Sequence, residues 1–219
     1  MPRPYLWYTV VPLPNIDYTQ LLIGLSVLLL SLTVHEAAHA WSADWLGDDT
    51  ARRLGRVSLN PAVHIDPIGT LLFPLIAMMT NLPIIGWAKP VPVNTHNLGG
   101  HWKRKFMMIA AAGPASNVVM AAIAAVGVRL IGFENAGAPL FLFLLMMVII
   151  NILLAVFNML PIPPLDGGNV LSGLLHGRAY DMFDRLRPYG FLILYALIFT
   201  GVFERIIVPV QEGIVGWLL

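Results

Sequence analysis

Long apolar runs are the feature that most limits what this chain can fold into. Residues 18–34 carry no charged side chain, and neither do residues 106–128 and 139–160. A helix rises 1.5 Å per residue, so about 20 apolar residues cross a hydrocarbon core of about 30 Å. A fourth, shorter run covers residues 188–203. We therefore predict an all-α polytopic membrane protein, with three core helices at about 18–45, 106–128 and 139–160 and a further transmembrane helix at about 188–203.

The composition supports the same class. Apolar residues make up 58% of the 219 residues and charged residues only 11%, whereas about 25% of a soluble domain is charged. Thirteen Lys and Arg against twelve Asp and Glu leave a net charge of +1, so no basic surface exists to bind nucleic acid. There is no cysteine, which excludes disulfides, thiolate metal sites and cysteine nucleophiles. Any metal or acid–base chemistry must therefore use His, Asp and Glu.

The first apolar run is expected to be a membrane helix and not a cleaved signal peptide. Arg3 is the only basic residue before it, and the run continues directly into ionisable residues where a signal peptide would have a small-residue cleavage site.

The region of about residues 52–94 is expected to contain short strands and a re-entrant segment. Valine and leucine alternate after Arg56, and the prolines of NPAVHIDP prevent a long helix. Residues 67–88 are apolar but interrupted, which suits a hairpin that enters and leaves one face of the membrane. The interrupting residues are Pro74, Pro83 and Gly86. The basic stretch 89–105 then predicts an exposed loop.

The motif His35-Glu36-Ala37-Ala38-His39 lies at the end of the first apolar run. Histidines four residues apart share one face of a helix, so both imidazoles can bind one zinc ion, with Glu36 beside a zinc-activated water. Ionisable residues at membrane depth are costly, by about 2.5–3.5 kcal/mol each for Asp, Lys or Arg on insertion scales, so three within five residues call for a compensating partner. The alternative is a polar, interfacial helix end with hydrogen-bonded histidines.

A catalytic zinc ion usually has three protein ligands, so a third is needed. The candidates are His64, His96, His101, His176, Asp66 and Asp166. Asp166 is favoured because prolines unwind the apolar run before it and two glycines permit a tight turn after it, in a predicted loop at residues 161–168. Its alternative role is that of a turn-forming Asp-Gly pair.

Membrane topology gives a separate test of Asp166. Two ligands of one ion must lie on the same side, so the chain must cross an even number of times between His39 and Asp166. The second and third helices supply two crossings, which requires residues 67–88 to be re-entrant or interfacial. Ten cations then share one side and three the other. The ten are Arg52, Arg53, Arg56, Lys89, Lys103, Arg104, Lys105, Arg178, Arg185 and Arg187; the three are Arg3, Arg129 and Arg205. The positive-inside rule makes the crowded side cytoplasmic, so we expect a multi-pass protein of the cytoplasmic membrane, its site near the cytoplasmic face and its N-terminus outside.

Five stretches resemble the site-2 protease family of intramembrane zinc metalloproteases, in its short bacterial and archaeal branch. They are HEAAHAW (35–41), GRVSLNPAVHIDPIGT (55–70), GWAKPVPVN (86–94), AGPASN (112–117) and FNMLPIPPLDGG (157–168). The first and last are specific in combination. The resemblance covers most of the chain and implies one membrane-embedded metalloprotease domain over residues 1–219, built on a three-helix catalytic core. Neither a PDZ domain after the first helix nor a C-terminal nucleotide-sensing domain is expected.

The resemblance also implies the chemistry. One Zn²⁺ per chain would be held by His35, His39 and Asp166, with Glu36 as general base and acid, and Asn158 matches an asparagine near the scissile carbonyl. The expected activity is hydrolysis of peptide bonds in transmembrane segments, as in regulated intramembrane proteolysis. The expected partners are the lipid bilayer and a single-pass membrane protein already shortened by another protease.

A transmembrane substrate must unwind locally before cleavage, because a helix hides its carbonyl groups in internal hydrogen bonds. We expect residues 55–60 to form an edge strand that pairs with the unwound substrate, and residues 67–88 to act as a gate. The candidate substrate-binding or gating residues are Val57, Leu59, His64 and Asn117. The alternative is that these segments only cap the helix bundle.

Two other function classes compete with a protease. A transporter or channel would also contain buried ionisable residues, but here they gather at one membrane end and no inverted repeat is visible. An inactive, substrate-binding relative would be expected to lack part of the catalytic set, which is complete in this sequence.

Overall fold

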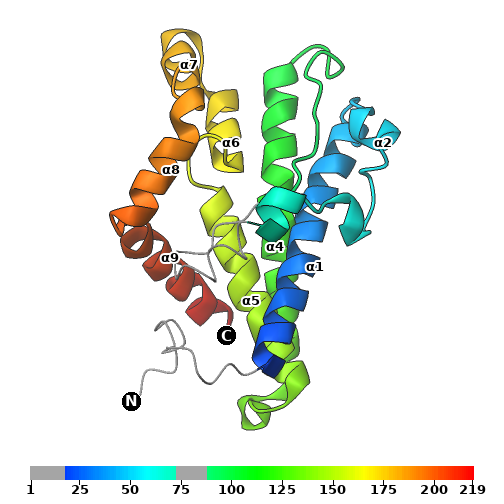
Figure 1. Ribbon diagram of the computed structural model, residues 1–219, viewed down its shortest axis with the longest axis vertical. Helices are drawn as coiled ribbons and strands as arrows, with labels where there is room; N and C mark the ends of the chain where they lie inside the picture. Colours follow the sequence, from blue (N-terminus) through cyan, green and yellow to red (C-terminus); the bar gives the residue numbers. More distant parts are fainter. Residues whose placement is uncertain (1–17, 73–87) are drawn as a thin grey trace.

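The structure is a computed structural model that describes residues 18–72 and 88–219, and within these ranges the chain is helical and contains no strand (Figure 1). In the part of the chain that the structure describes, three helices are long and apolar enough to cross a membrane: α1 (Tyr18–Trp45), α4 (Trp102–Ile131) and α5 (Pro139–Asn158). Helix α4 packs against both α1 and α5. The predicted all-α class and its three long apolar helices are confirmed.

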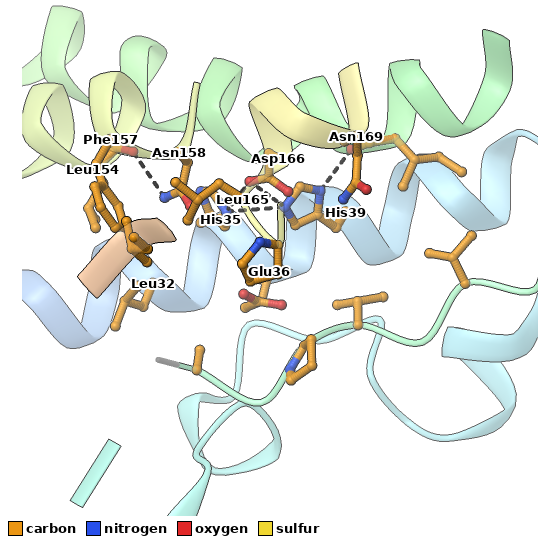
Figure 2. Close-up of a pocket in the computed structure, with 18 of the residues that line it drawn as sticks. Leu32, His35, Glu36, His39, Leu154, Phe157, Asn158, Leu165, Asp166 and Asn169 are labelled. Carbon is orange, nitrogen blue, oxygen red and sulfur yellow. Dashed lines mark hydrogen bonds and ion pairs between the residues drawn. The ribbon is translucent and has the colours of Figure 1, made fainter. Parts of the chain in front are cut away.

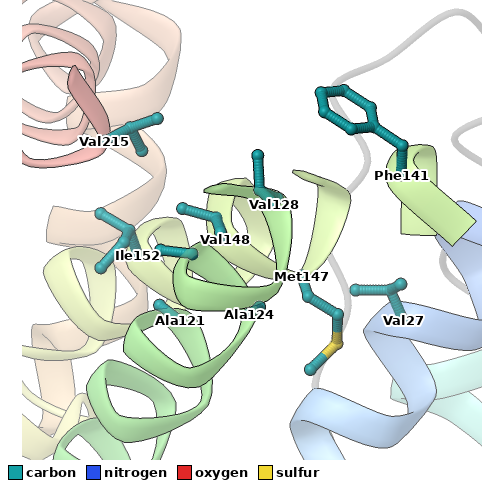
Figure 3. Packing of buried hydrophobic residues seen from close by; sticks show 10 residues of the cluster. Val27, Ala121, Ala124, Val128, Phe141, Met147, Val148, Ile152 and Val215 are labelled. Atoms are coloured by element: carbon teal, nitrogen blue, oxygen red, sulfur yellow. The ribbon is translucent and has the colours of Figure 1, made fainter. Parts of the chain in front are cut away.

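Small side chains line the contacts between the long helices, while large apolar side chains cover the outside of the bundle. Ala121 and Ala124 of α4 are buried against α5 together with Val148 and Ile152 (Figure 3). Large apolar residues of α1 and α4 are exposed instead, among them Leu22, Leu25, Ile123, Val126 and Leu130. Close helix approach through small residues and an apolar exterior are both typical of helix packing in lipid.

Helix α4 begins four residues earlier than predicted, so the exposed loop ends at His101. Basic residues are unfavourable in the first turn of a helix, but here Lys105 has specific acceptors. Its Nζ donates to the carbonyl oxygens of Leu46 (3.0 Å) and Leu98 (2.8 Å). These contacts join the end of α1 to the start of α4. Helix α5 ends at Asn158, two residues before its predicted end.

The predicted short strands are wrong for the described residues. After α2 (Thr50–Arg53), residues 55–60 form turns and bends. The Ser58 hydroxyl accepts a hydrogen bond from the Asn60 amide, and the Asn60 side chain accepts one from Ala62, capping the short helix η2 (Pro61–Val63). Such local side-chain bonds compete with strand pairing. Helix η3 (Pro67–Leu72) follows, and the rest of the predicted re-entrant segment, residues 73–87, lies outside the described residues.

The C-terminal third contains more helix breaks than predicted. Between α5 and α6 (Asp166–Leu174) the chain turns back, and it continues through α7 (Gly177–Asp184) and η5 (Arg187–Tyr189) to α8 (Gly190–Phe199) and α9 (Val202–Leu218). The helix predicted at 188–203 is interrupted at Gly201, where φ is +70°. Residues 177–199 and 204–218 are bent by 80° relative to each other. Helix α8 is about 15 Å long, too short to cross a membrane alone, so a fourth span exists only if the bent pair is counted as one.

Asp48 connects the end of α1 to the loop that leads into α4. Its side chain is fully buried and accepts hydrogen bonds from Thr50 N (3.2 Å), Thr50 Oγ1 (2.5 Å), Asn94 N (2.6 Å) and Asn97 Nδ2 (2.8 Å). Burial alone would raise the pKa of Asp48, but these donors hold the pKa below its ordinary value. The ionised carboxylate is thus part of the fold on this side of the bundle.

We expect Asp48→Asn to lower the free energy of unfolding by about 1.5–3 kcal/mol at neutral pH, because hydrogen bonds to a charged acceptor are lost. Since the native pKa of Asp48 is depressed, the wild-type advantage should be complete above about pH 4, near the ordinary Asp pKa, and should disappear as the pH falls through the native pKa. Unfolding in detergent at several pH values measures this. Asp49→Asn, which breaks an exposed ion pair with Arg53, is the matched control and should have little effect; equal losses in the two variants would contradict the assignment.

Candidate metal centre

Helix α1 and the start of α6 bring three metal-binding side chains to one point (Figure 2). The Nε2 atoms of His35 and His39 are 3.1 Å apart, and Asp166 Oδ2 lies 3.1 Å from the first and 3.3 Å from the second. Both histidines are buried and Asp166 is half-buried. Within residues 18–72 and 88–219 this is the one group of three or more such side chains close enough to share an ion.

The opposite ring nitrogens of both histidines face acceptors on α4. His39 Nδ1 lies 2.7 Å from the carbonyl oxygen of Ile109, and His35 Nδ1 lies 2.6 Å from Asn117 Oδ1. An oxygen of this kind can only accept, so each Nδ1 must carry the hydrogen. In a neutral imidazole the Nε2 atom then has a free lone pair, and both lone pairs are available at the point where Asp166 lies.

These three groups fit a bound metal ion. Two imidazole nitrogens and one carboxylate oxygen, with no thiolate, form a donor set found in catalytic zinc sites. A tetrahedral ion with bonds of about 2.0–2.1 Å separates its ligands by about 3.3 Å, close to the observed 3.1–3.3 Å. Three facing lone pairs also repel one another unless a cation or a proton lies between them.

Gly113 of α4 creates the space in which the histidines meet. A Cβ atom added at this position would collide with His39 Nε2 and lie 2.6 Å from His35 Nε2. The surrounding AGPASN stretch is recognisable in the sequence, but this role of Gly113 is not, because the two histidines lie more than 70 residues away along the chain. The glycine lets the backbone of α4 approach the site as closely as it does.

Asp166 is held in place by the way α6 begins, and the predicted loop at 161–168 is corrected accordingly. Residues 166–168 form the first turn of α6, where a negative charge is favoured by the helix dipole. A Cβ atom at Gly167 would collide with the Met159 carbonyl oxygen, and one at Gly168 would lie 2.8 Å from the Ile162 carbonyl carbon. The two glycines therefore let α6 fold back onto the end of α5.

The three side chains face a cavity of about 620 Å³ that is lined mainly by apolar residues. Glu36 is half-buried and lines this cavity beside the histidines (Figure 2). Asn158, the last residue of α5, also lines it; its Nδ2 donates to the Leu154 carbonyl oxygen (3.0 Å), which leaves the second N–H of the amide available. The wall across the cavity is the extended segment 88–93, followed by side chains of α8.

Arg56 is a buried cation close to Glu36. Its Nη2 donates to the carbonyl oxygen of Lys89 and so fixes the extended segment at the cavity wall. Burial lowers the pKa of Arg56, while the nearby negative charge of Glu36 acts in the opposite direction. In the sequence Arg56 indicates only the membrane topology; its position in the GRV stretch is the available signal for a local role.

The remaining predicted site residues do not line the described part of the cavity. Val57 and Leu59 lie in the bends before η2, and Leu59 is exposed. His64 is buried; its Nε2 bonds to the Ser58 carbonyl oxygen (2.9 Å), and its own carbonyl oxygen accepts from Lys89 N (2.8 Å). Asn117 is fully buried behind His35. None of the other third-ligand candidates joins the metal-binding group.

Comparison with known proteins agrees with this geometry. The family model described as peptidase family M50 matches residues 133–201, which include α5 and Asp166. The "Putative zinc metalloprotease YwhC" of Bacillus subtilis (strain 168) is 32% identical over 222 residues, covering 95% of this chain and 91% of the relative. The chain belongs to peptidase family M50, the site-2 protease family.

Another relative of this M50 protein is the "Putative zinc metalloprotease Rip2" of Mycolicibacterium smegmatis, 30% identical over 179 residues, with 81% of this chain and 66% of the relative covered. Rip2 of Mycobacterium tuberculosis (strain H37Rv) is 26% identical over 170 residues, covering 77% of this chain and 63% of the relative. No solved structure gives a significant match. This M50 protein is a metalloprotease with several apolar, membrane-length helices.

We expect Gly113→Ala to weaken metal binding strongly, because the new methyl group occupies the space between the two histidine Nε2 atoms. Zinc content of the purified protein, measured by atomic spectrometry, tests this. Gly127→Ala is the matched control on the same helix, since its methyl group would meet only the flexible side chain of Leu144. Normal zinc content in Gly113→Ala would show that the ion is held elsewhere.

Proposed function

We propose that this protein is an intramembrane zinc metalloprotease that hydrolyses peptide bonds in the transmembrane segments of membrane proteins. The observation that carries the proposal is the convergence of His35, His39 and Asp166 with Glu36 at one cavity between membrane-length helices. A soluble protease could have the same four side chains, but it would not surround them with helices whose outer faces are apolar.

The arrangement of the helices supports a proposed depth and orientation of the site. His35 lies about 25 Å along α1 from Tyr18, and the site is also near the end of α5 and the start of α6. The basic residues of α2, α7 and the start of α4 belong to the same end of the bundle (Figure 1). The positive-inside rule supports a site near the cytoplasmic face of the cell membrane, with the N-terminus on the outside.

In this proposal one Zn²⁺ per chain is held by His35, His39 and Asp166; when bound it acts as a Lewis acid that lowers the pKa of a water and polarises a carbonyl group. Glu36 takes the proton from the attacking water and later delivers it to the leaving amine. Glu36 lines the cavity and has no hydrogen bond from the described residues. Both of its carboxylate oxygens are therefore available. Asn158 offers its second N–H to the scissile carbonyl oxygen.

The shape of the cavity favours a substrate that is locally unwound. An intact helix is about 10–12 Å across with its side chains, and the carbonyl groups in its interior are not free. The cavity has a volume of about 620 Å³ and is lined by apolar side chains. We therefore propose that the substrate is a single-pass membrane protein, shortened beforehand by another protease so that its transmembrane end can unwind and enter.

Glu36→Gln should abolish cleavage of a model transmembrane substrate, by at least about 100-fold, because proton transfer is lost. Zinc content should stay normal, since Glu36 is not part of the ligand group. The measurement uses purified full-length protein reconstituted with a transmembrane peptide. Cleavage at the normal rate by a zinc-loaded Glu36→Gln protein would refute the role of Glu36.

Asp166→Ala should lose zinc or bind it much more weakly, because one of the three converging donors is removed. Metal titration of the variant, compared with His64→Ala as the matched control, gives the answer. His64 is buried in the neighbouring loop but does not join the donor group, so its variant should retain zinc. The reverse pattern would identify His64 as the third ligand.

A further inference from the structure

A chain of buried hydrogen bonds runs from His35 into the centre of the helix bundle. Asn117 Oδ1 contacts His35 Nδ1 (2.6 Å), and Asn117 Nδ2 donates to Asn151 Oδ1 (2.7 Å) and, over a longer distance, to the Ser31 carbonyl oxygen (3.4 Å). Asn151 Nδ2 in turn donates to the Met147 carbonyl oxygen (2.8 Å) and to Ser31 Oγ (2.9 Å). Asn117, Asn151 and Ser31 have no exposed surface, and they come from α4, α5 and α1 respectively.

The far end of this chain fixes the direction of every bond in it. The Met147 carbonyl oxygen can only accept, so the nitrogen of the Asn151 amide must face it and the Asn151 oxygen must face Asn117. The Asn117 amide must then present its nitrogen to Asn151 and its oxygen to His35. As a result the hydrogen of His35 must be on Nδ1, and its Nε2 lone pair faces His39 and Asp166.

We propose that Asn151 is a positioning residue for the metal centre: acting through Asn117, it fixes His35 in the Nδ1–H tautomer that can bind the ion. The proposal rests on the proposed role of His35 as a ligand. Asn151 itself does not line the cavity and lies outside the motifs described above.

The two histidines differ in how their tautomers are fixed. His39 Nδ1 faces a backbone carbonyl oxygen, that of Ile109 (2.7 Å), which cannot reverse its polarity. His35 instead faces a side-chain amide, which can rotate by half a turn and exchange donor for acceptor. A reversed Asn117 would donate to Nδ1 of His35, move the ring hydrogen to Nε2 and remove the lone pair that the ion requires. Asn151 opposes this reversal because its oxygen would then face the oxygen of Asn117; the Ser31 carbonyl oxygen, 3.4 Å from Asn117 Nδ2, opposes it through a longer bond.

The test compares Asn151→Leu with Asn151→Asp in the full-length protein. Leucine removes the acceptor for Asn117, so the zinc dissociation constant should rise by about 10- to 100-fold, the usual effect of losing an outer partner of a metal ligand. A carboxyl group introduced here is kept neutral by its apolar surroundings. It can accept from Asn117 and donate to Met147, so Asn151→Asp should bind zinc almost as the wild type does. Competition with a chelator measures both constants.

A second readout does not depend on activity or on bound metal. In metal-free protein labelled with ¹⁵N-histidine and kept above pH 8, the imidazole nitrogen shifts report which nitrogen carries the hydrogen. His35 Nδ1 should carry a hydrogen in the wild type and in Asn151→Asp, whether or not a proton also lies between the three metal-binding groups, and should lack it in a fraction of Asn151→Leu molecules. If the protein proved not to cleave membrane segments, this tautomer result would still be obtained. The proposed protease function and the proposed role of Asn151 can therefore fail separately.

A purely structural role would give different results. Val148→Ala removes a fully buried side chain one turn earlier on α5 without touching the hydrogen-bonded chain; it should lower thermal stability but leave zinc affinity and the His35 tautomer unchanged. Should Asn151→Leu fail to fold, Asn151→Ala removes the same acceptor with a smaller side chain. Unchanged tautomer and affinity in the folded variant, or equal losses in Asn151→Leu and Asn151→Asp, would overturn the proposal.

Discussion

Three lone pairs face one another inside an apolar helix bundle, and the packing of α1, α4 and α6 around them follows from that convergence. His35, His39 and Asp166 bring their donor atoms to within 3.1–3.3 Å of each other, an arrangement that is unfavourable without a cation or proton between them. Each surrounding feature serves to hold it. Helix α4 supplies both Nδ1 acceptors, Gly113 leaves space for the rings, and the glycines after Asp166 seat α6 against the end of α5.

The membrane setting explains why the buried polar groups of the long helices α1, α4 and α5 are so fully partnered. Lipid offers no hydrogen bonds, so a buried amide or imidazole must find its partner within the protein. Ser31, Asn117 and Asn151 do so with one another and with backbone carbonyl oxygens. The same bonds join α1, α4 and α5 at the level of the metal centre, where a bundle of small apolar residues would otherwise allow the helices to slide.

Much of this arrangement could be predicted from the sequence, because its main signals are local. An uncharged run sets the length of α1, and the spacing of His35 and His39 places them on one helical face. The prolines and glycines around Asp166 predict a helix break next to a potential metal ligand. The convergence of these residues agrees with the crossing-number argument, although the residues of the predicted hairpin lie largely outside the described ranges.

The features that could not be predicted from the sequence depend mainly on contacts that local sequence patterns do not show. Strands were expected at 55–60, but Ser58 and Asn60 bond to nearby backbone instead. The sequence predicts a later start of α4 than the structure has. The reason is that the acceptors of Lys105 come from the end of α1 and from the loop before α4. Gly113 and Asn151 gave no local sign of their roles, since one meets its partners across a helix interface and the other acts through a second side chain.

Both histidines have their Nδ1 acceptors on α4, and this affects how the bundle assembles. Ile109 and Asn117 lie eight residues apart on one continuous helix, so a slip of α4 by one residue would move both acceptors together by about 1.5 Å. The two ligands therefore cannot be set independently: the site is complete only when α4 is seated in register against α1. An ion that binds only this register stabilises it by mass action, which makes metal loading and the final packing of the bundle a single coupled equilibrium.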